Sequence, residues 1–147
     1  MFATHGHHAR LLVSGQESLG RVAVIEMNAS YGSGGPLHVH SREDELVYVL
    51  EGSVTFYRDG ERIDAEAGSV QFLPCGSEHT FSVESSEARL LVLVFPAGLE
   101  AALTEPPTSP PSFEQLVATA ALAGVSITGP ARQPHATLDS STPQLIS

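Results

Sequence analysis

The chain has 147 residues and a net charge of -10, because 17 acidic residues stand against seven arginines and no lysine. A chain this acidic repels phosphate backbones and anionic lipid, so nucleic acid and membranes are poor candidates as partners. Neutral small molecules, cations and other protein chains are better candidates, and the length fits one domain with a hydrophobic core.

Three features bear on the compartment. The single cysteine, Cys75, excludes a disulfide within the chain. The opening MFATHGHHAR lacks the apolar segment of a secretory signal, and no apolar run approaches the roughly 18 residues of a membrane span. We therefore expect a cytoplasmic protein.

Composition divides the chain into three regions. Residues 1–10 form a polar arm that contains His5, His7 and His8. Residues 11–95 alternate between apolar and polar positions and are punctuated by glycine, which is typical of short strands. Residues 96–147 hold a proline-rich linker, EPPTSPPS, then one helix and a flexible tail from residue 128 that is expected to be disordered.

The middle region is predicted to form an all-β, antiparallel sandwich or barrel. Strands are expected over residues 21–28, 46–52, 53–63, 69–74, 79–84 and 89–95. Asp59-Gly60 favours a two-residue hairpin turn, since both residues tolerate positive φ angles. Segment 89–95 is apolar on both faces, so it is either central in a sheet or covered on its outer side by a partner subunit.

A short C-terminal helix is predicted after the linker. Ser112 is suited to cap its first turn, Gln115 occupies the reciprocal capping-box position, and Gly124 supplies a stop. The helix is expected to pack against the outside of the barrel through the face formed by Leu116, Ala120 and Ala123.

Four residues have the spacing of a metal site. His38 and His40 are one residue apart, so in a strand both side chains point to the same face. Glu45 can enter from the next strand and His79 from a third. Three imidazoles and one carboxylate suit Fe, Mn, Ni, Co or Zn, and leave coordination positions for substrate. Structural histidines ahead of an ordinary strand are the alternative.

The pattern resembles the two conserved motifs of the cupin superfamily, including the 15 residues between them. The matched positions are Gly32, His38, His40, Glu45, Gly52, Gly68, Pro74, Gly76 and His79. The motifs span residues 32–83, and the flanking strands extend the resemblance over 11–95. It implies a single cupin-type β-barrel or jelly roll, a homodimer that covers 89–95, and a metal bound by His38, His40, Glu45 and His79.

One position departs from the family pattern. Val83 stands where the second motif often has asparagine, so the cavity wall is expected to be apolar there and to favour a hydrophobic ligand. Gln71 is a second candidate for the cavity, although an outward-facing side chain is the simpler interpretation for Gln71 and for Glu26. Glu43 and Asp44 are interpreted as a solvated acidic loop.

Five further residues lie outside the predicted set of four metal ligands. Cys75 is interpreted as an incidental thiol and His135 as a tail residue without a role. His5, His7 and His8 are either a solvated tail or the source of a lid or an extra metal ligand.

Three functional hypotheses follow from the resemblance. The first is a quercetinase-like dioxygenase, an oxidoreductase that acts on a phenolic substrate, with Glu45 as ligand and proton acceptor. The second is a zinc-type polyketide cyclase of secondary metabolism, in which a metal polarises a ketone. A fifth ligand from the arm would favour this cyclase. The third is a non-catalytic binding or sensor module.

Overall fold

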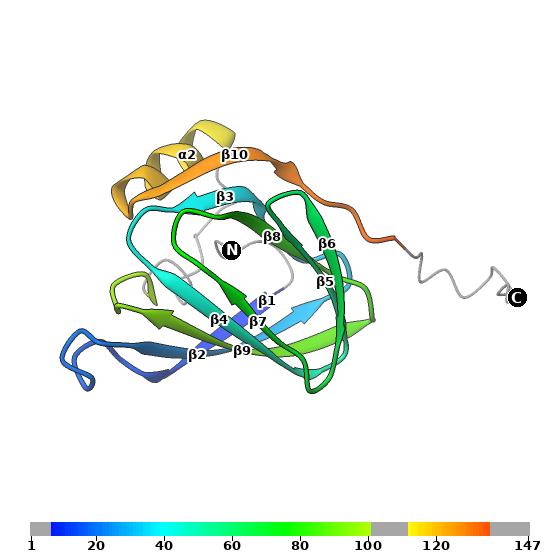
Figure 1. Ribbon diagram of the computed structural model, residues 1–147, viewed down its shortest axis with the longest axis horizontal. Coiled ribbons are helices and arrows are strands. Elements are labelled where there is room, and N and C mark those ends of the chain that lie inside the picture. Colours follow the sequence, from blue (N-terminus) through cyan, green and yellow to red (C-terminus); the bar gives the residue numbers. More distant parts are fainter. Residues whose placement is uncertain (1–6, 101–111, 136–147) are drawn as a thin grey trace, which may run out of the picture.

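The computed structural model describes residues 7–100 and 112–135, and there the chain forms two five-stranded antiparallel sheets that face one another (Figure 1). The β9 sheet has the strand order β1 (His7–Val13), β2 (Ala23–Ser30), β9 (Glu87–Phe95), β4 (Asp44–Glu51) and β7 (Val70–Leu73). The β8 sheet has the order β10 (Val125–Ala131), β3 (Pro36–His40), β8 (Glu78–Val83), β5 (Ser53–Arg58) and β6 (Glu61–Glu66). The antiparallel barrel predicted from the sequence is confirmed.

The core lies between the two sheets. Alternation along each strand sends every second side chain inward, as the burial of Ala23, Ile25 and Met27 on β2 illustrates. Phe56 from β5 and Phe81 from β8 pack with ring centroids 6.2 Å apart. Burial of such aromatic and aliphatic side chains is the main stabilising term, at about 1.5–3 kcal/mol for each large side chain.

Local turn chemistry agrees with the sequence. Asp59 and Gly60 have φ angles of 51° and 83°, and they connect β5 to β6 as a tight hairpin. Both angles are positive, as a type I′ turn requires. The hairpin therefore fixes the register in which β6 covers the edge of β5.

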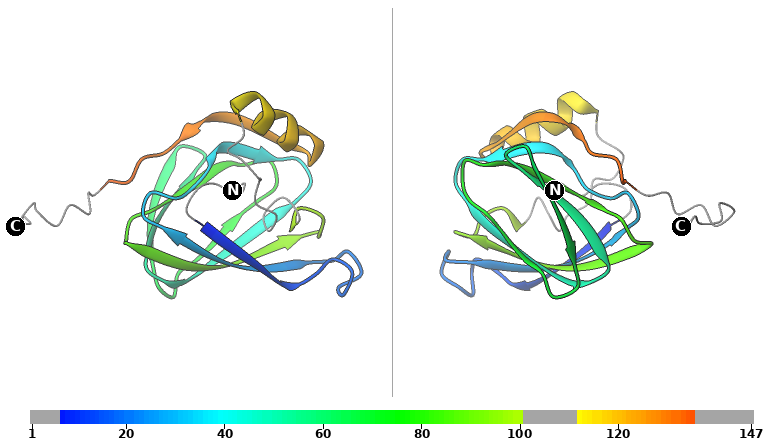
Figure 2. Two further views of the ribbon diagram at one scale, coloured as in Figure 1. Left: turned by 180° about the vertical axis from the view of Figure 1, so that it is seen from behind. Right: turned by 45° about the vertical axis from the view of Figure 1, so that its right-hand side comes forward.

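The predicted helix is confirmed as α2 (Phe113–Leu122). The Ser112 side chain accepts a hydrogen bond from the Gln115 backbone, and the Gln115 side chain accepts one from the Ser112 backbone. Gly124 follows the helix with a φ of 77°. Ala120 is fully buried, and the helix lies on the outside of β10 (Figure 2). The proline-rich linker lies outside the described residues.

The expectation of a disordered tail from residue 128 is wrong for residues 128–135. β10 pairs with β3, and Val125 lies opposite His40 while Ile127 lies opposite His38. Two bulges, at Thr128 and Pro130, break the alternation of side chains and hide the strand from a periodicity search. Proline is tolerated at such a bulge because it has no N–H to contribute to the ladder.

The last part of the expected polar arm is strand. Residues 7–10 belong to β1, which pairs with β2 at the edge of the β9 sheet. This edge pairing satisfies backbone groups that a free arm would leave to water.

In the residues that the structure describes, no helix is both long and apolar enough to cross a membrane.

Candidate metal centre

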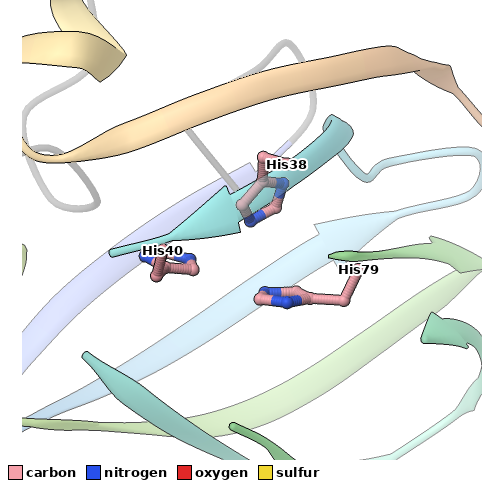
Figure 3. Close-up of side chains that lie close together, drawn as sticks. All are labelled: His38, His40 and His79. Atoms are coloured by element: carbon pink, nitrogen blue, oxygen red, sulfur yellow. The ribbon is translucent and has the colours of Figure 1, made fainter. Parts of the chain in front are cut away.

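Three strands bring the four predicted ligands together. His38 and His40 lie on β3, His79 lies on β8 directly opposite His38, and Glu45 enters from β4 in the facing sheet. Figure 3 shows the three imidazole rings converging on one space, and one nitrogen from each ring lies within 4.8 Å of the others. Each of the four residues is at most 2% exposed. The spacing argument for their convergence therefore agrees with the geometry.

Hydrogen bonds orient all three rings in the same way. Each Nδ1 faces an oxygen that can only accept: Pro36 O at 2.7 Å from His38, Ser77 O at 3.2 Å from His79, and Glu43 Oε1 at 3.1 Å from His40. A carbonyl or carboxylate requires a donor, so Nδ1 carries the proton in each neutral ring. The lone pair of each Nε2 is then presented to the common space.

Several hydrogen-bond acceptors face one another in that space. Glu45 Oε2 lies 3.4 Å from His40 Nε2 and 3.5 Å from His79 Nε2. Within the described residues, these three atoms and Glu45 Oε1 make no hydrogen bond of good geometry. Buried acceptors that face one another are unfavourable without a cation between them. Three imidazole nitrogens and one carboxylate are a donor set that fits a divalent first-row transition metal.

The pKa values of the buried groups reflect two opposing effects, burial and the charge of neighbouring groups. Burial lowers the pKa of His38 to about 2. Burial alone would lower the pKa of His40, but the Glu45 and Glu43 carboxylates outweigh it and raise that pKa. Burial would likewise raise the pKa of Glu45, yet His40 and His79 hold it well below its usual range.

The interpretation of Glu43 as part of a solvated acidic loop is wrong. Glu43 is 5% exposed, and its carboxylate accepts the hydrogen bond from His40 Nδ1. Its neighbour Asp44 is half-buried and accepts a hydrogen bond from the Cys75 backbone N–H at 2.8 Å. The position of Glu43, three residues after a ligand histidine, was the only sequence signal for this contact.

The two cavity candidates both lie on inward-facing positions. Val83 shares the inner face of β8 with His79, but it has no exposed surface and belongs to the packed core. It is therefore not an open cavity wall in this conformation. Gln71 lies opposite the buried Val47 and is half-buried, so it faces inward rather than outward. Glu26, in contrast, does face outward, where it accepts hydrogen bonds from Arg10 and Arg89.

Of the three histidines in the expected arm, His8 is the one whose side chain the structure describes, and it is not a metal ligand. His8 is exposed and lies opposite Asn28 on the outer face of the β9 sheet. The β2 residue in the same cross-strand row as Glu45 is Ala23, because both lie opposite Val94 on β9. Asn28 is five residues further along β2, and five residues of strand span roughly 16 Å. The lid or extra-ligand hypothesis is therefore wrong for His8. His5 and the side chain of His7 lie outside the described residues.

His135 has contacts that the sequence did not indicate. Its Nε2 lies 2.6 Å from the Tyr57 hydroxyl, and its backbone N–H donates to Glu84 Oε1 at 2.8 Å. Arg132 lies over the Tyr57 ring, with its guanidinium carbon 5.3 Å from the ring centroid. The segment after β10 is thereby held against the outer face of the β8 sheet.

Comparison with known proteins gives three kinds of likeness. The family model described as "Cupin domain" matches residues 25–96. Quercetin 2,3-dioxygenase of Bacillus subtilis (strain 168) is 28% identical over 83 residues, which cover 56% of this chain and 25% of the dioxygenase. The matched segment thus spans only a quarter of that enzyme.

Two solved structures extend the comparison to the fold. A putative ethanolamine utilization protein Q from Salmonella typhimurium is 30% identical, with a TM-score of 0.55, over 64% of this chain and 72% of that one. KdgF from Halomonas sp. has a TM-score of 0.61 at 17% identity, over 68% of this chain and 87% of that one. At that identity, the second likeness concerns the fold alone.

Proposed function

This chain belongs to the cupin superfamily, and on that premise we propose that it is a metal-dependent enzyme, most similar in chemistry to a dioxygenase of phenolic compounds. The observation that carries the proposal is the convergence of buried acceptors from His38, His40, Glu45 and His79 on one space. The likeness to a quercetin 2,3-dioxygenase supports the choice among reaction classes.

The three histidines and Glu45 would hold the metal, with Fe, Mn, Ni, Co and Zn as the candidates. A redox-active ion would supply one-electron chemistry toward dioxygen and polarise a phenolic oxygen. Glu45 has two carboxylate oxygens, so one remains available to accept the phenolic proton while the other stays a ligand. Burial of the carboxylate excludes competing water from that transfer.

The surroundings of the centre are apolar. Leu73 and Val94 lie opposite Glu45 on the two neighbouring strands, and Val125 lies opposite His40. All three side chains are at most 3% exposed. They belong to the same packed core as Val83, so the expected preference for aromatic or phenolic ligands rests on the apolar character of these surroundings and not on an open cavity.

The experiment combines metal analysis with oxygen uptake. Protein purified without chelator, and protein reconstituted with each candidate metal, is tested on a panel of phenols that includes flavonols. We expect about one metal ion per chain and oxygen uptake that Glu45→Gln abolishes, while Glu66→Gln, an exposed carboxylate on β6, leaves it unchanged. Absence of metal after every reconstitution would reject the metalloenzyme. Metal without oxygen uptake would reject the dioxygenase and direct the next assay to cyclisation.

The outer face of the β9 sheet is suited to a second copy of the chain. One row across four strands is entirely apolar and consists of Val24, Leu93, Leu46 and Phe72. Beside it, Tyr48 and Val70 are 36% and 47% exposed. The polar end of this face is an ion-pair network without net charge, formed by Arg10, Glu26, Arg89 and Glu51.

A homodimer fits this face because a two-fold interface places identical surfaces together, and a surface without net charge avoids the repulsion expected of a chain with charge -10. The mass in solution, measured by sedimentation, is expected to correspond to two chains. Phe72→Glu should give monomers, whereas Leu122→Glu, at an 84% exposed position on α2, should not. A monomeric parent would contradict the proposal.

A further inference from the structure

Glu43 is a buried carboxylate that the four-ligand centre does not account for. It lies in the short connection between β3 and β4, is 5% exposed, and has its Oε1 3.1 Å from His40 Nδ1. Among the ion pairs of the described residues, Glu43 pairs with His40 and with no arginine. Burial of a carboxylate is unfavourable unless a positive charge compensates it, and a cation bound through the ring of His40 would supply that charge.

His40 differs from the other two histidines in what holds its ring. Backbone carbonyls accept the Nδ1–H of His38 and His79, whereas a carboxylate accepts that of His40. On the opposite side of the ring, His40 Nε2 faces Glu45 Oε2 at 3.4 Å. His40 therefore lies between two buried carboxylates, and a hydrogen bond from Nδ1 to a carboxylate increases the donor strength of Nε2.

The charges of the centre add up to a defined value. Three neutral histidines contribute nothing, and Glu43 and Glu45 contribute one negative charge each. In the described part of the chain, the arginine ion pairs involve other carboxylates: Glu26, Glu51, Glu61 and Asp64. Two negative charges are balanced by one divalent cation, and a low-dielectric surrounding makes such neutrality favourable.

We propose that Glu43 is a positioning residue of the metal centre, which locks His40 in the tautomer that presents Nε2 and supplies the second buried negative charge that matches the centre to a divalent ion. The inference rests on the proposed metal site. It predicts that the contribution of Glu43 has two separable parts, the hydrogen bond to Nδ1 and the charge.

Two substitutions separate these parts. Glu43→Gln keeps an oxygen that accepts the Nδ1–H and removes the charge, and Glu43→Ala removes both. Glu66→Gln, an exposed carboxylate on β6, changes the net charge of the chain by the same amount as Glu43→Gln and serves as the control. Affinity for Zn²⁺ and Co²⁺ is measured by competition with a chelator, and the urea midpoint of the metal-free protein checks that each variant folds.

We expect Glu43→Ala to lower the metal affinity by about 10–100-fold, the range typical for groups that orient a ligand histidine. Glu43→Gln should lie between Glu43→Ala and the parent, and Glu66→Gln should match the parent. The visible spectrum of the Co²⁺ protein and the ¹⁵N shifts of the histidines in the Zn²⁺ protein should change in Glu43→Ala, because the ring of His40 is no longer held. A purely structural role would lower the urea midpoint without altering these spectra.

The outcomes distinguish this inference from the proposed function. A parent protein that binds neither ion would reject the metal centre itself. A parent that binds metal while both Glu43 variants match it in affinity and spectrum would overturn the role of Glu43 alone. Should Glu43→Ala fail to fold, Glu43→Gln is nearly isosteric, and its affinity relative to Glu66→Gln decides whether the charge contributes.

Discussion

His38 should make the metal-free protein sensitive to mild acid. It is 1% exposed, and burial lowers the pKa of its imidazole from the ordinary 6.5 to about 2. Between these two values the unfolded chain binds a proton at this residue and the folded chain does not. The free energy of unfolding therefore falls as the pH decreases below 6.5.

The magnitude follows from the shift. One pH unit corresponds to about 1.4 kcal/mol for a single proton, so lowering the pH from 6.5 to 4.5 should destabilise the protein by about 2 kcal/mol through His38 alone. The raised pKa of His40 adds stability that is already present below 6.5, and it is lost only as the pH rises through its folded value. The lowered pKa values of Glu45 and Glu26 matter only below 4.5. The chosen window thus isolates His38.

Urea unfolding of chelator-treated protein, followed by far-ultraviolet circular dichroism because the chain has no tryptophan, measures the effect. The parent should lose about 2 kcal/mol between pH 6.5 and 4.5. His38→Gln, which cannot titrate, should lose much less, whatever its stability at the higher pH. His8→Gln, at an exposed position, should behave as the parent. Equal losses in the parent and in His38→Gln would refute the reasoning.

Three further substitutions test the packed core, the close approach of Gly34 to β8 and the cap of α2. Val83→Asn should lower the free energy of unfolding by about 1–3 kcal/mol in urea titrations, because it places an unpaired amide in the fully packed core; an unchanged midpoint would mean that the site holds a polar partner. Gly34→Ala should cost about 1–3 kcal/mol and weaken metal retention, because a Cβ there would overlap the Phe81 carbonyl oxygen on β8; a stable, metal-binding variant would contradict the close approach. Ser112→Ala should speed hydrogen exchange in α2, since the lost cap contributes about 1 kcal/mol; exchange at the parental rate would show that tertiary packing, not the cap, holds the first turn.

The ligand set was readable from the sequence because its geometry is local and periodic. A gap of one residue places His38 and His40 on one face of any strand, and that relation does not depend on the rest of the fold. The cap of α2 and the Asp59-Gly60 turn were readable for the same reason, since each depends on residues within a few positions of one another. The spacing of the family motifs then identified Glu45 and His79 as the remaining two ligands.

The surroundings of that ligand set were decided by the conformation of the turn after β3 and by contacts between distant segments. Nothing local distinguishes Glu43 from an ordinary acidic loop residue, and only the turn between β3 and β4 brings its carboxylate to His40. Pairing with β3 makes a strand of Val125–Ala131, whose two bulges remove the alternation that a sequence pattern needs. The inner face of β8 was predictable by parity, but whether Val83 meets a cavity or a packed core depends on how side chains from both sheets fill the interior.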